Sequence, residues 1–139
     1  MKAFQPEATV LIVPGLRGHV ADHWQTLLAE GLEKVVTVPP LTSDKLSCQA
    51  RVEAITQALA RIQGPVILVA HSAGVLMVAH WVAQQGAARC RHSIRGALLV
   101  TPPDLDASWP SHYPSAHAMQ AGGWHPLPRM KLPFSSLVV

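Results

Sequence analysis

The segment Ala70-His71-Ser72-Ala73-Gly74 is the part of this sequence best suited to chemistry. It matches the G-x-S-x-G pattern of a nucleophile elbow, with alanine in place of the first glycine. In such an elbow a sharp turn between a strand and a helix exposes the serine hydroxyl at the carboxyl end of the sheet. The backbone folds tightly there, so small residues are needed two before and two after the serine, and Ala70 and Gly74 meet that need. The motif predicts that Ser72 is a nucleophile for carbonyl carbon.

The same turn predicts where a developing negative charge would be held. Ala73 begins the expected helix, and its N–H group lies at the positive end of the helix dipole. A second donor is expected from the loop after the first strand, which here reads Pro14-Gly15-Leu16-Arg17-Gly18. We therefore predict an oxyanion hole made by the backbone N–H groups of Leu16 and Ala73. The alternative is an ordinary tight turn between a strand and a helix, with no catalytic role.

Short β-branched runs alternate with amphipathic segments, and this alternation predicts the framework that positions the elbow. The expected strands are 9–13, 35–38, 66–69 and 96–101, with a fifth from 134 to 139; the expected helices are 22–32, 47–62 and 73–85. In the first helix, Trp24, Leu27, Leu28 and Leu32 share one face. Strands that are apolar on both faces and separated by helices imply a parallel sheet covered on both sides. We predict one α/β domain over residues 1–139, a three-layer, α/β-hydrolase-like arrangement of about five mostly parallel strands.

Residues 104–133 differ from the rest of the chain. They are rich in proline, glycine, serine and histidine and show no clean periodicity. A stretch of this length without regular structure is commonly a lid or a mobile binding loop. Trp109 and Trp124 lie in it and are candidates to line a pocket, whereas Trp24 and Trp81 are expected in the core.

Composition narrows the class of protein. Of the 139 residues, 49% are hydrophobic and 14% are charged, which is typical of a compact globular domain. The net charge is +3 and the pI is near 9.2, but the basic residues are scattered and not interleaved with aromatics, so nucleic-acid binding is not expected. Cys48 and Cys90 are too few for a disulfide framework or a zinc site, which favours a reducing compartment. No apolar run is long enough for a signal peptide or a membrane span, and we expect a cytoplasmic protein.

Three stretches of the sequence resemble a known family. They are VLIVPGLRGHVADHWQ, LVAHSAGVLMVAHWV and LPFSSLVV. They are similar to the small α/β-hydrolases named for retinoblastoma-binding protein 9 and bacterial YdeN, and the resemblance covers nearly the whole chain. The elbow and His23-Trp24 are its more specific parts. The resemblance implies a minimal serine hydrolase with a Ser-Asp-His triad in which Ser72 is the nucleophile.

The resemblance also implies an acid after the strand that starts at Phe134 and a histidine on a later loop. Triad order in this fold is serine, acid, histidine, so we expect both residues beyond Val139. A serine hydroxyl without a base is a poor nucleophile, and we expect little turnover from this chain. We also expect the incomplete edge strand to favour aggregation.

Residues within the chain offer alternatives for the base. His112, His117 and His125 lie in the stretch 104–133, and Asp104 or Asp106 follows the fourth expected strand. A Ser72–His125–Asp104 arrangement is therefore an alternative triad. His71 adjoins the nucleophile, but neighbouring side chains diverge on a sharp turn, so we expect it to pack below the site.

Metal or cofactor chemistry is not expected. His19 is a further candidate base, and His19 and His23 are four residues apart, which suits a metal pair on a helix. No third ligand accompanies them in the sequence, and acyl transfer by serine needs no cofactor.

The sequence therefore predicts a serine hydrolase that acts on small carboxylic esters or amides through an acyl-enzyme at Ser72. The alternative is a non-catalytic binding module with a hydrolase fold. The family name suggests binding to pocket proteins through an L-x-C-x-E string, but Leu46-Ser47-Cys48-Gln49-Ala50 lacks the glutamate. That partner is therefore not expected, and the sequence leaves the oligomeric state open.

Overall fold

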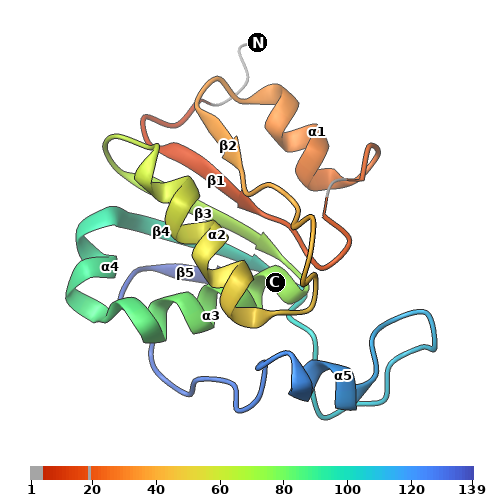
Figure 1. Cartoon of the computed structure of the whole chain (residues 1–139). Coiled ribbons are helices and arrows are strands. Elements are labelled where there is room, and N and C mark those ends of the chain that lie inside the picture. Colours follow the sequence, from red (N-terminus) through yellow and green to blue (C-terminus); the bar gives the residue numbers. More distant parts are fainter. Residues whose placement is uncertain (1–4, 19) are drawn as a thin grey trace.

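The computed structural model describes residues 5–18 and 20–139 (Figure 1). Its centre is one sheet of five strands: β1 (Thr9–Val13), β2 (Val35–Thr37), β3 (Val66–His71), β4 (Ile94–Val100) and β5 (Ser136–Val138). The strand order is β2-β1-β3-β4-β5, and every neighbouring pair is parallel. The predicted α/β fold with a parallel five-stranded sheet is confirmed.

The helices are α1 (Trp24–Gly31), α2 (Cys48–Ala60), α3 (Ala73–Gln85), α4 (Ala87–Ser93) and α5 (Ala116–Ala121). Alternate residues of β1 show how they cover the sheet, because successive side chains of a strand point to opposite faces. Leu11 and Val13 belong to the larger core cluster, with α2 and α3, whereas Val10 and Ile12 pack with α1. Helices therefore lie on both faces of the sheet, as predicted (Figure 1).

The first helix is shorter than predicted and contacts the sheet through a narrower row of side chains. Trp24, Leu28 and Leu32 pack against the sheet at a spacing of four residues. Leu27, expected on the same face, is 56% exposed. Two turns of helix lying on a sheet bury one narrow row, and Leu27 falls to its solvent side. The sequence analysis also missed Gln25, which is buried beside this row.

The stretch 104–133 contains one short helix and packs against the core. Ser115 caps α5, because its Oγ accepts a hydrogen bond of 3.1 Å from the N–H of Ala118. Trp124 is fully buried and donates from Nε1 to the carbonyl of Leu46, at 2.8 Å. The expectation that Trp124 lines a pocket is therefore wrong: its indole fills the core beside the start of α2. Trp81 is also buried in the core, as predicted.

One further helix was not predicted. Gly86 ends α3 with φ of 86°, a conformation that favours glycine, and α4 begins at the next residue. The predicted end of α3 at residue 85 is confirmed, but the segment after it is helical. Cys90 of α4 is fully buried, and so this short helix closes the core below β4.

Candidate active site

Ser72 lies at the turn between β3 and α3 in a backbone conformation that few residues other than glycine adopt. Its φ is 54° and its ψ is −126°. The N–H of Ser72 donates to the carbonyl of Val100 at 2.9 Å, and its own carbonyl accepts from Val75 at 2.9 Å. Strained residues of this kind persist where the surrounding structure holds them, and they occur often at active sites. The backbone of Ser72 therefore has the sharp turn that a nucleophile elbow requires.

Gly74 explains why the turn needs a glycine two residues after the serine. A Cβ at Gly74 would overlap the carbonyl oxygen of Val13 and would lie 2.8 Å from that of Pro14. The end of β1 therefore passes directly against the first turn of α3. Ala70 is fully buried on the other side of the serine. The small residues at positions 70 and 74, which the motif requires, are therefore both closely enclosed by the fold.

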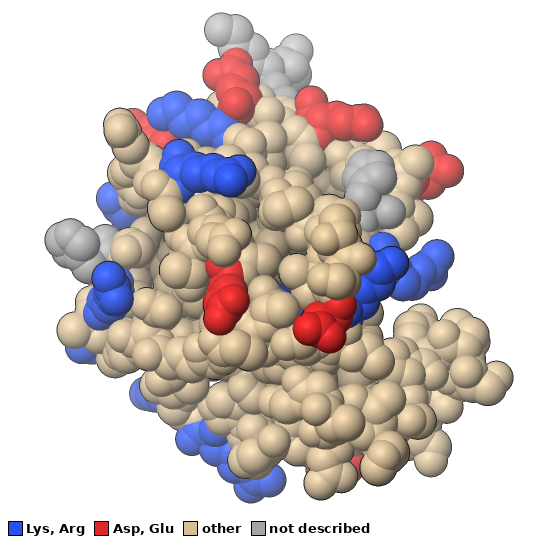
Figure 2. Space-filling view, viewed as in Figure 1, with Lys and Arg blue, Asp and Glu red and all other residues tan. Residues whose placement is uncertain are grey.

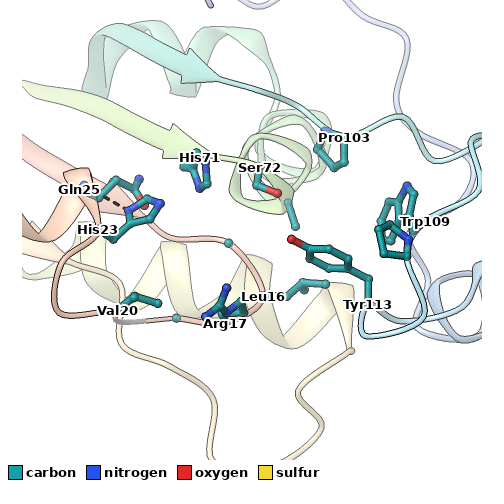
Figure 3. Close-up of a pocket in the computed structure, with 14 residues that line it drawn as sticks. Leu16, Arg17, Val20, His23, Gln25, His71, Ser72, Pro103, Trp109 and Tyr113 are labelled. Atoms are coloured by element: carbon teal, nitrogen blue, oxygen red, sulfur yellow. Dashed lines mark hydrogen bonds between the residues drawn. The ribbon is translucent and has the colours of Figure 1, made fainter.

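The loop after β1 runs beside the elbow. A Cβ at Gly15 would lie 3.5 Å from the Cβ of Ser72 and 3.9 Å from the backbone nitrogen of Ala73. Gly18 donates to the carbonyl of Gly15 at 3.1 Å, which closes this loop as a tight turn. Leu16 and Ala73, the predicted oxyanion donors, line the same cavity as Ser72 (Figure 3). The fold thus brings together the three site residues that the sequence singled out.

The loop is held from behind by a buried arginine that the sequence analysis missed. Arg51 of α2 donates to the carbonyl of Lys45 from Nε at 3.1 Å and from Nη2 at 2.7 Å. It also donates from Nη2 to the carbonyl of Leu16, at 3.4 Å. Burial lowers the pKa of Arg51 from its ordinary value, but guanidinium remains charged at neutral pH. The burial of Arg51 could not be predicted from the helical pattern of α2, because an arginine in an amphipathic helix is expected to be exposed to solvent.

The cavity in front of Ser72 has a volume of about 330 Å³. In Figure 3, His23, Gln25 and His71 lie to one side of Ser72, and Pro103, Trp109 and Tyr113 lie to the other. Leu16, Arg17 and Val20 form the floor between them. Trp109 therefore lines a pocket, as expected from the sequence, whereas Tyr113 was not anticipated.

Two histidines stand on the polar side of this cavity. The rings of His23 and His71 are 4.5 Å apart between centroids and meet edge to face, and His71 also packs on Trp24 at 5.8 Å. Burial lowers the pKa of His71 from its ordinary value, and the proximity of His23 lowers it further. His71 is therefore neutral at pH 7. The expectation that it packs below the site is wrong, because its side chain is part of the cavity wall.

Gln25 fixes the geometry of this side. Its Nε2 donates to the carbonyls of Val13 and Val69, at 3.3 and 3.1 Å, and so joins the ends of β1 and β3. Its backbone N–H donates to Nδ1 of His23 at 3.2 Å, which caps α1 (Figure 3). His23 is therefore held as the N-cap of α1.

The alternative triad is not assembled. Among the described residues that line the cavity, the histidines are His23 and His71, so His112, His117 and His125 are not brought to Ser72. Nδ1 of His125 is buried without a hydrogen-bond partner. Asp104 and Asp106 do not line the cavity either, and Oδ1 of Asp104 accepts from the backbone of Asp106 at 2.9 Å. His19, a further candidate base, lies outside the described residues.

Other classes of site find no support in the part of the chain that the structure describes. It holds no group of three or more His, Cys, Asp or Glu residues placed to bind a metal ion. None of its helices is long and apolar enough to cross a membrane. On the face drawn in Figure 2, lysines and arginines are dispersed over uncharged surface and do not form one stripe. On this face the described lysines and arginines form no continuous track of the kind that nucleic acid requires.

Comparison with known proteins gives the family. A family model described as serine hydrolase matches residues 10–139, which include the elbow, the loop after β1 and all of the five strands except Thr9, the first residue of β1. The chain belongs to the serine hydrolase family. The chain resembles the crystal structure of a YdeN-like hydrolase from Pectobacterium atrosepticum, with a TM-score of 0.68 and 23% sequence identity. No curated protein matches the sequence.

The structural match covers 94% of this chain but only 61% of the YdeN-like hydrolase. At this level of identity the match shows a shared fold. The resemblance to the YdeN family that the sequence indicated is confirmed at the level of family and fold.

Proposed function

We propose that the chain hydrolyses small carboxylic esters or amides through an acyl-enzyme at Ser72. The observation that carries this proposal is the strained Ser72 turn, which faces a cavity between the Leu16 loop and the start of α3. A turn that served packing alone would not need a φ of 54° at a serine directed into a cavity. Membership of the serine hydrolase family supports the same proposal.

The proposed reaction follows from the positions of these groups. The hydroxyl oxygen of Ser72 attacks the substrate carbonyl, an O–C bond forms, and the π electrons move to the carbonyl oxygen. The N–H groups of Leu16 and Ala73 donate hydrogen bonds to that oxygen, and the positive end of α3 stabilises its charge. The C–O or C–N bond to the leaving group then breaks, and the leaving group takes the proton that Ser72 released. Water then attacks the carbonyl carbon of the acyl-enzyme in the same way. The bond from that carbon to the Ser72 oxygen breaks, Ser72 takes up a proton, and the carboxylic acid is released.

The general base limits the rate in this proposal. His23 and His71 are the histidines of the cavity within the described part of the chain, and neither has a hydrogen bond to a carboxylate there that would orient it. Proton removal from Ser72 therefore lacks the acid–histidine pair of a complete triad, which the family resemblance assigns to residues after β5. We propose that this chain turns over esters and amides slowly and reacts at a measurable rate only with activated reagents.

The alternative role as a binding module draws no support from the L-x-C-x-E-like string. Ser47 is the N-cap of α2, and its Oγ accepts from the N–H of Ala50 at 3.1 Å. Cys48 is buried, and burial raises the pKa of its thiol to about 11. The string is therefore folded into the start of a helix and is not presented to a partner. Both cysteines are free and buried, which supports a reducing, cytoplasmic location as part of the proposal.

Covalent labelling tests the proposed function. The chain is incubated with a fluorophosphonate, and its intact mass is compared with that of Ser72→Ala. We expect one adduct on the folded wild-type chain and none on the variant. An adduct that persists in Ser72→Ala, or the absence of any adduct on folded wild-type protein, would contradict a nucleophilic Ser72.

A further inference from the structure

The cavity has two chemically different sides, and the nucleophile lies between them. His23, Gln25 and His71 form a polar side near the ends of β1 and β3 (Figure 3). Trp109 and Tyr113, from the segment after β4, form an aromatic side together with Pro103. A substrate whose scissile carbonyl sits at Ser72 therefore meets polar groups in one direction and apolar groups in the other.

The aromatic side is a built structure. We call residues 109–113 the aromatic turn. It is closed by a hydrogen bond of 3.0 Å from the N–H of Tyr113 to the carbonyl of Pro110. The indole N–H of Trp109 donates to the carbonyl of Asp104 at 2.8 Å, and the rings of Trp109 and Tyr113 meet edge to face at 6.3 Å. Because the polar atom of Trp109 is already bonded, its ring offers the cavity an apolar surface.

Tyr113 adds one polar group to this surface. The residue is 42% exposed and belongs to neither core cluster, although a tyrosine gains most when its ring is buried. In Figure 3 the side chain extends across the cavity with its hydroxyl toward Ser72. The Tyr113 side chain is thus open to a ligand in the cavity, with its hydroxyl on the side of Ser72.

We propose that the aromatic turn is the specificity wall of the site, which binds an apolar group on one side of the reacting bond. This inference rests on the proposed function and adds its substrate class: esters or amides with an apolar group of moderate size on one side of the reacting bond. A cavity of about 330 Å³ is at the small end of ligand sites. It suits a short alkyl or single aryl group and does not suit a long acyl chain.

Pairs of fluorophosphonates that differ in chain length test whether the aromatic turn binds an apolar group. One fluorophosphonate pair carries methyl or hexyl on phosphorus, in the place of an acyl group, and a second pair carries methoxy or hexyloxy, in the place of an alcohol. In each reaction the O–P bond to Ser72 forms, the P–F bond breaks, fluoride leaves and the serine proton goes to solvent. In one of the two pairs, we expect the wild-type chain to react about tenfold faster with the six-carbon probe than with the one-carbon probe. Apolar contacts discriminate between substrates on this scale. The pair that shows the preference identifies which part of the substrate the wall binds.

Variants connect this preference to the aromatic turn. We expect Trp109→Ala and Tyr113→Ala to reduce the preference to about twofold or less, while Met130→Ala, an exposed apolar residue of the same segment outside the cavity, keeps it. Tyr113 is exposed, so its variant tests the wall even if Trp109→Ala does not fold. A wild-type chain that labels Ser72 without a chain-length preference, or a preference that survives both variants, would overturn the inference and leave the proposed function intact.

A binding measurement separates failure of the inference from failure of the proposed function. If no probe labels Ser72, ligand-observed NMR measures the binding of methyl hexanoate and of hexyl acetate to the Ser72→Ala chain. Binding that weakens about tenfold with the added change Tyr113→Ala, and not with Met130→Ala, supports the wall. The absence of binding, or equal binding in both variants, overturns it.

Discussion

At the scale of single residues, the site depends on how closely two backbones pass. The carbonyls at the end of β1 occupy the space that a side chain at position 74 would need. Gly74→Ala therefore forces backbone to move in a packed core, and we expect a loss of about 1–3 kcal/mol in the free energy of unfolding. Urea unfolding followed by circular dichroism measures this loss.

Gly31 provides the matched control. A Cβ at Gly31 meets no atom within 4 Å, and the residue ends α1. Gly31→Ala should leave the free energy of unfolding unchanged or raise it by about 0.4–1 kcal/mol, because alanine reduces the freedom of the unfolded chain. Equal losses in the two variants would show that the approach of β1 to α3 is not the cause.

Arg51 links the predicted oxyanion loop to the start of α2. With methionine at this position, the carbonyl of Leu16 loses its partner and the adjoining Lys45 carbonyl loses two hydrogen bonds. We expect Arg51→Met to slow phosphonylation of Ser72 by about tenfold, since a loosened donor costs transition-state stabilisation. Rate constants are compared with those of Arg61→Met, an exposed arginine that ends the same helix. Equal rate constants in the two variants would show that Arg51 does not position the loop.

At the scale of elements, the sequence predicted what is decided locally. The strand 9–13 and the turn around Ser72 were readable because β-branched runs and small residues act on their immediate neighbours. The core position of Trp124 was not readable, since it depends on the carbonyl of Leu46, 78 residues away. The roles of Gln25 and Arg51 were missed for the same reason: each bonds to backbone carbonyls that only the tertiary fold brings near.

The contact between α3 and the stretch 104–133 includes a buried histidine. His80 is buried in α3, and its Nε2 is 3.1 Å from the carbonyl of Trp124, to which it donates. Burial lowers the pKa of His80 below its ordinary value of 6.5, although the bond to Trp124 acts in the opposite direction. Between the lowered pKa and 6.5, the unfolded chain binds a proton that the folded chain does not. The free energy of unfolding therefore rises with pH through this window and is lost as the pH falls.

Substitution of His80 tests this coupling. We expect His80→Gln, which keeps a side-chain donor and removes the titration, to show a smaller loss of stability between pH 7.5 and 5.5 than the wild type. Urea unfolding at the two pH values measures the difference, with His117→Gln as a control because His117 is exposed in α5. An unchanged pH dependence in His80→Gln would assign the acid sensitivity to another group, of which His71 is the first candidate.

At the scale of the whole molecule, the sheet has one apolar edge. β5 is the last strand in the sheet order, and all three of its residues are exposed. Leu137 is 63% exposed, and Val138 and Val139 are exposed to a similar degree. An edge strand that combines free backbone groups with apolar side chains is a template for pairing with another chain. Self-association of this chain should therefore proceed through β5.

A charge on this edge should oppose that pairing. We expect Leu137→Lys to lower the sedimenting or light-scattering fraction of the protein on mild heating, because a lysine on an edge strand disfavours the approach of a second strand. Leu27→Lys makes the same change of charge at a leucine that is 56% exposed on α1, away from the sheet edge. If the edge is responsible, Leu27→Lys leaves association unchanged. Equal effects of the two substitutions would instead point to net charge, since added charge opposes association wherever it lies on the surface.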